Sequence, residues 1–164
     1  YHCKYFQGIL LSCSGGESFV KIQEGTRVIA EAVFSELNKL ERVEFPKSLE
    51  YIGAASFQSC KNLREILFED GCDLKVIDLY AFADCANLKE PDFPLKLKKV
   101  NYHAFEECDA FENIRFPESV EYVDTYALVY CVNLKRIELP KHLEERCRLE
   151  AAIPGRKAPE IIFY

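Results

Sequence analysis

Residues 81–88 read AFADCANL, and three related octapeptides stand elsewhere in the chain: SFQSCKNL from Ser56, AFEECDAF from Ala104 and ALVYCVNL from Ala127. The second residue of each octapeptide is taken as the anchor of a repeat. The anchors, with one earlier copy, recur every 23 to 25 residues: Phe34, Phe57, Phe82, Phe105 and Leu128. A fixed period of this length indicates stacked repeats that bury a continuous core, which is a solenoid.

Each repeat combines a predicted strand with a predicted helical turn. Its second half alternates apolar and charged residues, as in Leu134–Leu139, and a proline usually follows, which is typical of a short strand that ends there. The AFxxC segment spaces apolar groups three residues apart, which predicts one turn of α- or 3-10 helix. Stacked copies would place a parallel sheet on one face of the solenoid and short helical turns on the other.

The full repeat pattern is P-x-x-[LV]-x-x-[IV]-x-x-x-A-F-x-x-C-x-x-L-x-x-[IV]-x-[FL]-P. It resembles the BspA-like leucine-rich repeat family, with four matching units between Pro46 and Pro140 and a fifth, Thr26–Pro46, that has Leu37 in place of cysteine. The resemblance implies an α/β solenoid, a right-handed leucine-rich-repeat superhelix. It also implies an extracellular or cell-surface module that binds proteins, since the family includes bacterial adhesins.

We expect one domain over residues 1–164: an N-terminal capping coil (1–25), five repeats of about 23 residues (26–140) and a degenerate C-terminal cap (141–164). Two places depart from the pattern. The segment Glu69–Leu74 carries a two-residue insertion, which predicts a bulge where the strand leaves the sheet. Pro91 occupies an inward strand position, and because proline has no backbone N–H, one hydrogen bond of the ladder should be missing there.

Composition narrows the function. The 164 residues carry 21 Lys and Arg against 27 Asp and Glu, a net charge of −6, which disfavours nucleic acid and anionic membranes as partners. The apolar runs are short, so direct membrane insertion is not expected. The three histidines are scattered, and the chain contains no G-x-S-x-G, H-E-x-x-H or phosphate-binding glycine loop. We expect a monomer without catalytic activity, cofactor or metal.

A cysteine column lies three residues after the anchors: Cys60, Cys85, Cys108 and Cys131. A metal site would need closely spaced ligand pairs, and a nucleophile would need a base within reach, for which His103 near Cys108 is weak evidence. Free cysteine behaves as a small buried apolar residue, so we expect packing, with Cys85 a buried reduced thiol. Outside the column stand Cys3, Cys13, Cys72 and Cys147; a Cys3–Cys13 disulfide and unpaired thiols are both consistent with the sequence.

Two sets of side chains are candidate binding residues. The outward strand positions form charged columns: Arg42, Glu44, Glu65, Glu90, Asp92, Arg115, Arg136 and Glu138. Such columns suit ligand binding, and they also suit a solvated surface of mutually compensating charges. An aromatic stripe lies two residues before three anchors, at Tyr80, His103 and Tyr126, which suits either recognition or packing between coils. The asparagines Asn62, Asn87 and Asn133 should hydrogen-bond the backbone of an adjoining coil.

The sequence leaves two functions open. The first is a non-catalytic protein-interaction or adhesion module, part of a larger surface or secreted protein, whose ligand would be a host, neighbouring-cell or matrix protein. The alternative is a structural spacer or intracellular scaffold segment without a specific ligand. Mostly unpaired cysteines favour the alternative, since proteins of oxidising compartments tend to use their thiols.

Overall fold

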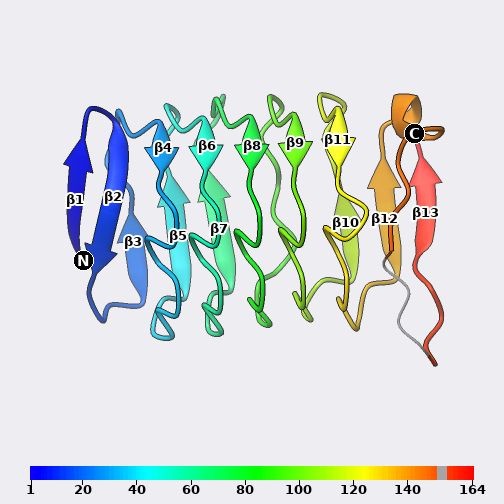
Figure 1. Cartoon of the computed structure of the whole chain (residues 1–164), viewed down its shortest axis with the longest axis horizontal. Coiled ribbons are helices and arrows are strands. Elements are labelled where there is room, and N and C mark those ends of the chain that lie inside the picture. The colour runs from blue at the N-terminus through cyan, green and yellow to red at the C-terminus, as the bar shows by residue number, and fades with distance from the viewer. Residues whose placement is uncertain (151–154) are drawn as a thin grey trace.

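Two rows of short strands run along the length of the molecule (Figure 1). The computed structural model describes residues 1–150 and 155–164. The front row is one seven-stranded sheet in the order β1-β2-β4-β6-β8-β9-β11. Its strands are β1 (His2–Phe6), β2 (Ile9–Ser14), β4 (Val28–Ile29), β6 (Tyr51–Ile52), β8 (Val76–Ile77), β9 (Lys99–Val100) and β11 (Tyr122–Val123). All its neighbours are parallel except the β1–β2 hairpin.

The back row is the strand row that the repeats predict, and it consists of two three-stranded parallel sheets. In it Val20 pairs with Val43, and Val43 with Ile66, so the apolar columns stand in register as the period indicates. The sheets are β3 (Phe19–Lys21), β5 (Arg42–Phe45) and β7 (Glu65–Phe68), then β10 (Asn113–Arg115), β12 (Arg136–Leu139) and β13 (Glu160–Phe163).

The front row is a correction to the expected single strand face. Each of its repeat strands has two residues, too few for an alternating pattern to reveal, and the inward one, such as Ile52 or Val100, is fully buried. Their hydrogen bonds come from stacking: Tyr51 N–H, for example, donates to the Arg27 carbonyl one coil earlier at 3.1 Å. A strand of this length is therefore fixed by its neighbours rather than by its own sequence.

The helical turns expected at AFxxC do not form. These segments are consecutive turns in which residues two before and two after an anchor adopt positive φ, for example Tyr80 (55°) and Asp84 (57°) around Phe82. Alternate N–H groups then point along the solenoid, and Phe82 N–H donates to the Ala104 carbonyl of the next coil at 2.8 Å. A helix would use those donors within its own coil. In the described residues, the only helical element is the 3-10 helix Lys141–Leu143.

The core is a row of stacked phenylalanines joined by the cysteine column. The rings of Phe34, Phe57, Phe82 and Phe105 lie nearly parallel, with centroids 4.8, 5.0 and 5.4 Å apart. Each column cysteine is buried, and its thiol donates to the anchor carbonyl one coil earlier, at 3.0–3.3 Å. The cysteines are unpaired, so packing as their role is confirmed, and the structure adds a hydrogen bond.

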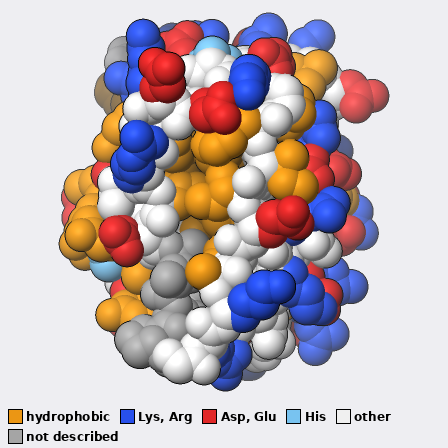
Figure 2. All heavy atoms as spheres, turned by 90° about the vertical axis from the view of Figure 1, so that its right-hand side faces the viewer, with side chains coloured by type: hydrophobic (Ala, Val, Ile, Leu, Met, Phe, Trp, Pro, Cys, Tyr) orange, Lys and Arg blue, Asp and Glu red, His pale blue; other side chains and the backbone are white. Residues whose placement is uncertain are grey.

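The ends and the asparagines complete the stacking. A disulfide joins Cys3 to Cys13 across the β1–β2 hairpin, which resolves the alternative left open by the sequence. At the other end, β13 forms within the expected C-terminal cap, and apolar side chains gather at the centre of this face with charged ones around them (Figure 2). Residues 151–154 of the expected cap lie outside the described residues. The amides of Asn62, Asn87 and Asn133 donate to carbonyls one coil earlier at 2.6–2.8 Å, as predicted.

The back row is interrupted at Pro91, and Figure 1 shows no strand there between β7 and β10. The sequence predicts the loss of one ladder hydrogen bond at Pro91. The structure shows a larger effect, because the whole segment 89–94 lies outside the sheet. The Glu90 side chain replaces part of the missing ladder. Its carboxylate accepts hydrogen bonds from the backbone N–H groups of Glu112 and Asn113, the latter at 2.9 Å. In the other repeats a backbone carbonyl fills this role, as Glu112 O does for Lys135 N–H at 2.8 Å.

Candidate functional site

The charged columns are internally paired at both ends of the back row. Near β5, Arg42 lies 2.6 Å from Glu44 and 3.4 Å from Glu65. Near β12, Arg115 lies 2.5 Å from Glu138, which Arg136 also approaches at 3.8 Å. These charged side chains already have partners of opposite sign within the columns. Ion pairs of this exposed kind contribute little to stability.

The two remaining members of the columns lie at the sheet break. Glu90 binds the backbone of β10, and although partial burial opposes ionisation, those N–H hydrogen bonds hold the pKa of Glu90 below its usual range. Asp92 is exposed on the interrupted segment. The structure therefore separates the eight predicted residues into two paired groups and two residues that flank a gap.

The aromatic stripe becomes a compact cluster. Tyr80 and Tyr126 lie on either side of His103, with ring centroids 5.0 and 5.8 Å from the imidazole. Tyr102 packs on all three, at 3.9 Å from His103 and in edge contacts with Tyr80 and Tyr126. The repeat alignment did not single out Tyr102. Its central position arises because β8, β9 and β11 bring the residues that follow them into one row. We call these four residues the tyrosine cluster.

The tyrosine cluster both packs and faces solvent. Tyr80 and His103 are half-buried, whereas Tyr102 and Tyr126 are 39% and 43% exposed. Leu79, also 43% exposed, extends the apolar surface toward the preceding coil, and repeat alignment did not single it out. Glu106 lies 2.8 Å from His103 Nδ1. Within the stripe, Tyr80 and His103 therefore pack between coils, whereas Tyr126 remains exposed.

The six free cysteines are buried. Burial raises the pKa of Cys60 and of Cys131 to about 12 and that of Cys85 and Cys108 well above the usual value. A thiol that stays protonated is a poor nucleophile and a poor metal ligand. Within residues 1–150 and 155–164, no group of three or more His, Cys, Asp or Glu side chains is placed to hold a metal ion, and no helix is long and apolar enough to span a membrane.

Two solved structures have the same fold at comparable similarity. A leucine-rich repeat protein of T. pallidum is 27% identical, with a TM-score of 0.78, over 82% of this chain and 64% of its own. A leucine-rich cell surface protein of Faecalibacterium prausnitzii A2-165 is 25% identical, with a TM-score of 0.77, over 88% of this chain and 39% of its own. This chain thus spans less than two thirds of the length of either protein.

A third structure, of a leucine-rich repeat protein from Bacteroides ovatus, is 23% identical with a TM-score of 0.62, over 85% of this chain and 46% of its own, and shares the fold. No curated protein matches the chain. The family model of the BspA type leucine rich repeat region matches residues 12–135 in six copies, which is most of the sequence and includes every anchor. The chain therefore belongs to the BspA-type leucine-rich-repeat family.

Proposed function

We propose that this chain is a non-catalytic protein-binding module of a cell-surface or secreted protein, and that the tyrosine cluster is its recognition surface. The observation that carries the proposal is the exposure of Tyr102 and Tyr126 in a cluster whose other two members, Tyr80 and His103, are half-buried and packed against them. Tyrosines that are held by ring contacts and partly exposed offer a large contact area at a low cost in side-chain entropy.

The rest of the surface supports this choice. The charged side chains near β5 and β12 form ion pairs with one another. In contrast, two rings of the tyrosine cluster and the adjacent Leu79 are exposed to solvent. Aromatic residues are enriched at protein interfaces, and Lys and Glu are depleted there. The expected partner is a protein of a host or neighbouring cell, or of the extracellular matrix, bound by a single copy of this module.

The F. prausnitzii relative is described as a cell surface protein, which supports an extracellular location for this module. The Cys3–Cys13 disulfide points the same way, since such bonds persist in oxidising compartments. A spacer without a ligand remains the competing function, and the experiment below separates the two.

The test is binding of the purified domain to immobilised matrix and cell-surface proteins, measured by surface plasmon resonance. We expect selective binding to a subset of them, with at least tenfold weaker binding for Tyr102→Ser combined with Tyr126→Ser. The matched control is Phe6→Ser, which removes an exposed aromatic ring from the N-terminal hairpin. Uniform, unselective binding, or equal effects of the two variants, would contradict the proposal.

A further inference from the structure

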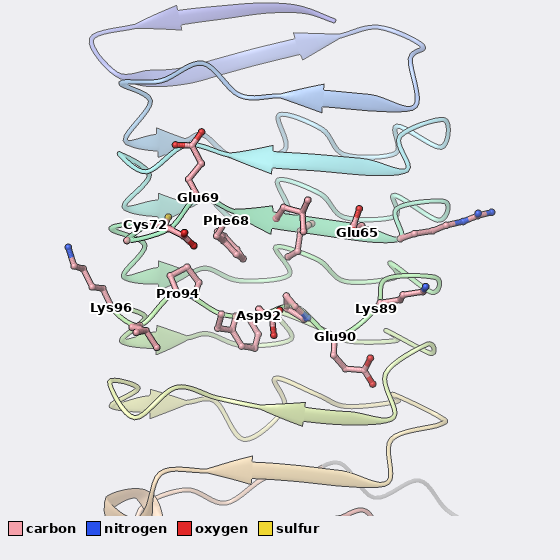
Figure 3. A pocket seen from close by; sticks show the side chains of 17 residues that line it. Glu65, Phe68, Glu69, Cys72, Lys89, Glu90, Asp92, Pro94 and Lys96 are labelled. Carbon is pink, nitrogen blue, oxygen red and sulfur yellow. The ribbon is translucent and has the colours of Figure 1, made fainter.

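The sheet break at Pro91 leaves a groove in the back row. It is a hollow of about 650 Å³, bounded by residues 64–72, which include β7, and by residues 89–96 of the next coil. Figure 3 shows β7 along one side and the chain from Lys89 to Pro94 and Lys96 along the other. We call it the β7 groove. Both departures from the repeat pattern border it, the Glu69–Leu74 insertion at one end and Pro91 on the facing side.

Backbone groups of β7 face this groove without a partner. Glu69 N–H donates to Phe45 O at 3.1 Å on the β5 side, whereas Arg64 O accepts from Lys89 N–H at 3.0 Å on the other side. In a parallel strand alternate residues face opposite neighbours, so Ile66 and Phe68 present their N–H and C=O groups to the groove. Among the described residues 64–96, no backbone hydrogen bond joins either residue to the facing segment.

The intact part of the same row shows what is missing. Phe116 occupies the repeat position of Phe68, and its N–H donates to the Glu138 carbonyl of the next coil at 3.0 Å. The ring stack at this position is interrupted as well: Phe45 stacks on Phe68 at 5.0 Å and Phe93 on Phe116 at 5.3 Å, but Phe68 does not stack on Phe93. Phe68 is accordingly half-buried, and in Figure 3 its side chain points toward the facing segment.

The charges of the β7 groove differ between its two ends. Arg64 and Lys89 lie where β7 begins, and Glu69 and Asp70 lie where it ends. Two carboxylates also line the first end, but Glu65 is paired with Arg42 and Glu90 accepts backbone N–H groups.

At the second end the Lys96 ammonium is 2.5 Å from Asp73, and Glu69 lies 3.7 Å from Lys21. Asp70 is therefore the carboxylate at this end for which the described residues provide no ion pair. A ligand that runs along β7 would therefore meet the cations of Arg64 and Lys89 first and the carboxylate of Asp70 last.

We propose that the β7 groove binds an extended segment of a protein partner, which adds a strand parallel to β7. Its backbone would pair with Ile66 and Phe68, one large apolar side chain would lie beside the Phe68 ring, and an acidic residue would precede and a basic residue follow that core. Strand addition to an exposed sheet edge is an established mode of peptide recognition, in which main-chain hydrogen bonds give affinity and alternate side chains give specificity. The inference rests on the proposed function, because it names a second contact of the same protein-binding module.

The probe is the acetylated and amidated peptide ETVTFK, titrated into the isotopically labelled domain while the amide resonances of Ile66 and Phe68 are followed by NMR. We expect saturable shifts of these two amides with a dissociation constant of about 1 mM or lower. The charge-exchanged peptide KTVTFE, the peptide ETVTSK and a peptide N-methylated at alternate residues should each bind at least threefold more weakly. Absence of saturable binding up to about 5 mM, or equal binding by the N-methylated peptide, would overturn the proposal.

Protein variants locate the binding. Pro91→Ile introduces the residue that stands at this repeat position elsewhere, as Ile66, Ile114 and Ile137, and supplies an N–H toward β10. The segment 89–94 can then return to the sheet, which should close the groove and weaken ETVTFK binding at least tenfold. The same change at Pro117, outside the groove, is the matched control. If Pro91→Ile does not fold, Leu95→Ser on the rim of the groove should weaken binding at least threefold, while Leu11→Ser on β2 should not. Unchanged binding in the groove variants overturns the proposal, and this result would leave the test of the tyrosine cluster unaffected.

Discussion

Replacement of Cys85 by alanine tests the account of the cysteine column. The side chain is fully buried, and its thiol lies 3.1 Å from the Phe57 carbonyl. Loss of a buried group of about methylene size costs about 0.8 kcal/mol in transfer free energy. A residual cavity of about 25 Å³ adds about 0.6 kcal/mol. The lost hydrogen bond adds about 0.5 kcal/mol or somewhat more. We therefore expect Cys85→Ala to lower the free energy of unfolding by about 2 kcal/mol.

The assay is equilibrium unfolding in urea, followed by circular dichroism. Cys147→Ala is the matched control, because this residue lies at the edge of the core and its thiol is 3.8 Å from the Val123 carbonyl, so its loss should cost less than half as much. Cys108→Ala should resemble Cys85→Ala, since both stand in the middle of the stack. In the native protein, the column thiols should resist an aromatic disulfide reagent and become reactive only on unfolding, because burial keeps them protonated.

Two results would refute this reasoning. A cost below about 0.5 kcal/mol for Cys85→Ala would show that neither the sulfur's packing nor its hydrogen bond matters at this position. Rapid modification of Cys85 in the native state would show that the thiol is accessible and that the column has a chemical rather than a structural role.

Three further outcomes follow from the capping and ladder contacts. Removing the Cys3–Cys13 disulfide with paired serines should cost roughly 2.5 kcal/mol, as expected for a loop closed over a separation of 10 residues, and thermal unfolding measures it. Glu90→Gln should be less stable than the native chain at neutral pH; because folding lowers the pKa of Glu90, the difference should disappear as the pH falls below about 4, as urea titrations at several pH values can establish. Asn87→Ala should lose about 1 kcal/mol, since its amide bonds the Lys61 carbonyl at 2.7 Å; a neutral result would contradict a structural role for the asparagine ladder.

The period made much of the fold predictable from sequence. Because each coil repeats the same apolar positions, aligning the anchors sufficed to place Val20, Val43 and Ile66 in one column, and the structure pairs them in that register. The buried state of Cys85 follows from the same alignment. In a solenoid each unit contacts only its neighbours, so one correctly read repeat carries most of the topology.

The conformation of the turns around the anchors could not be predicted from the repeat alignment. A spacing of three apolar residues fits a helical turn as well as the observed chain of turns, and the deciding feature is the positive φ of residues such as Tyr80 and Asp84. Side chains other than glycine seldom adopt this conformation, so composition gives no signal for it. It forms here because it turns the Phe82 N–H toward the next coil, and that hydrogen bond exists only in the stack.

For the candidate sites too, the sequence gives the positions of the residues but not the contacts between coils. The sequence located the charged columns and Tyr80, His103 and Tyr126, but whether a charge is free depends on distances across coils, such as the 3.4 Å between Arg42 and Glu65. In the sequence, the β7 groove corresponds to two separate departures from the repeat pattern, the Glu69–Leu74 insertion and Pro91. The pattern does not show that they border one groove; the structure does, because they belong to adjacent coils that meet there.

The effect of Pro91 on stability can be measured separately from binding. A proline at an inward strand position lacks a ladder donor, so its replacement has an expected effect on the free energy of unfolding. Pro91→Ile should let Glu90 and Asp92, which would be the backbone partners of Ile66 in the repeat register, return to the sheet. It should also extend the stack between Phe68 and Phe93, and we expect the free energy of unfolding to rise by about 1 kcal/mol. Proteins retain such local costs chiefly where function needs them. A variant that is more stable and yet no longer binds the ETVTFK peptide would identify the break as a binding feature. A variant that is less stable than the native chain would instead show that the segment 89–94 is already in its preferred conformation, and that the missing strand is not a defect.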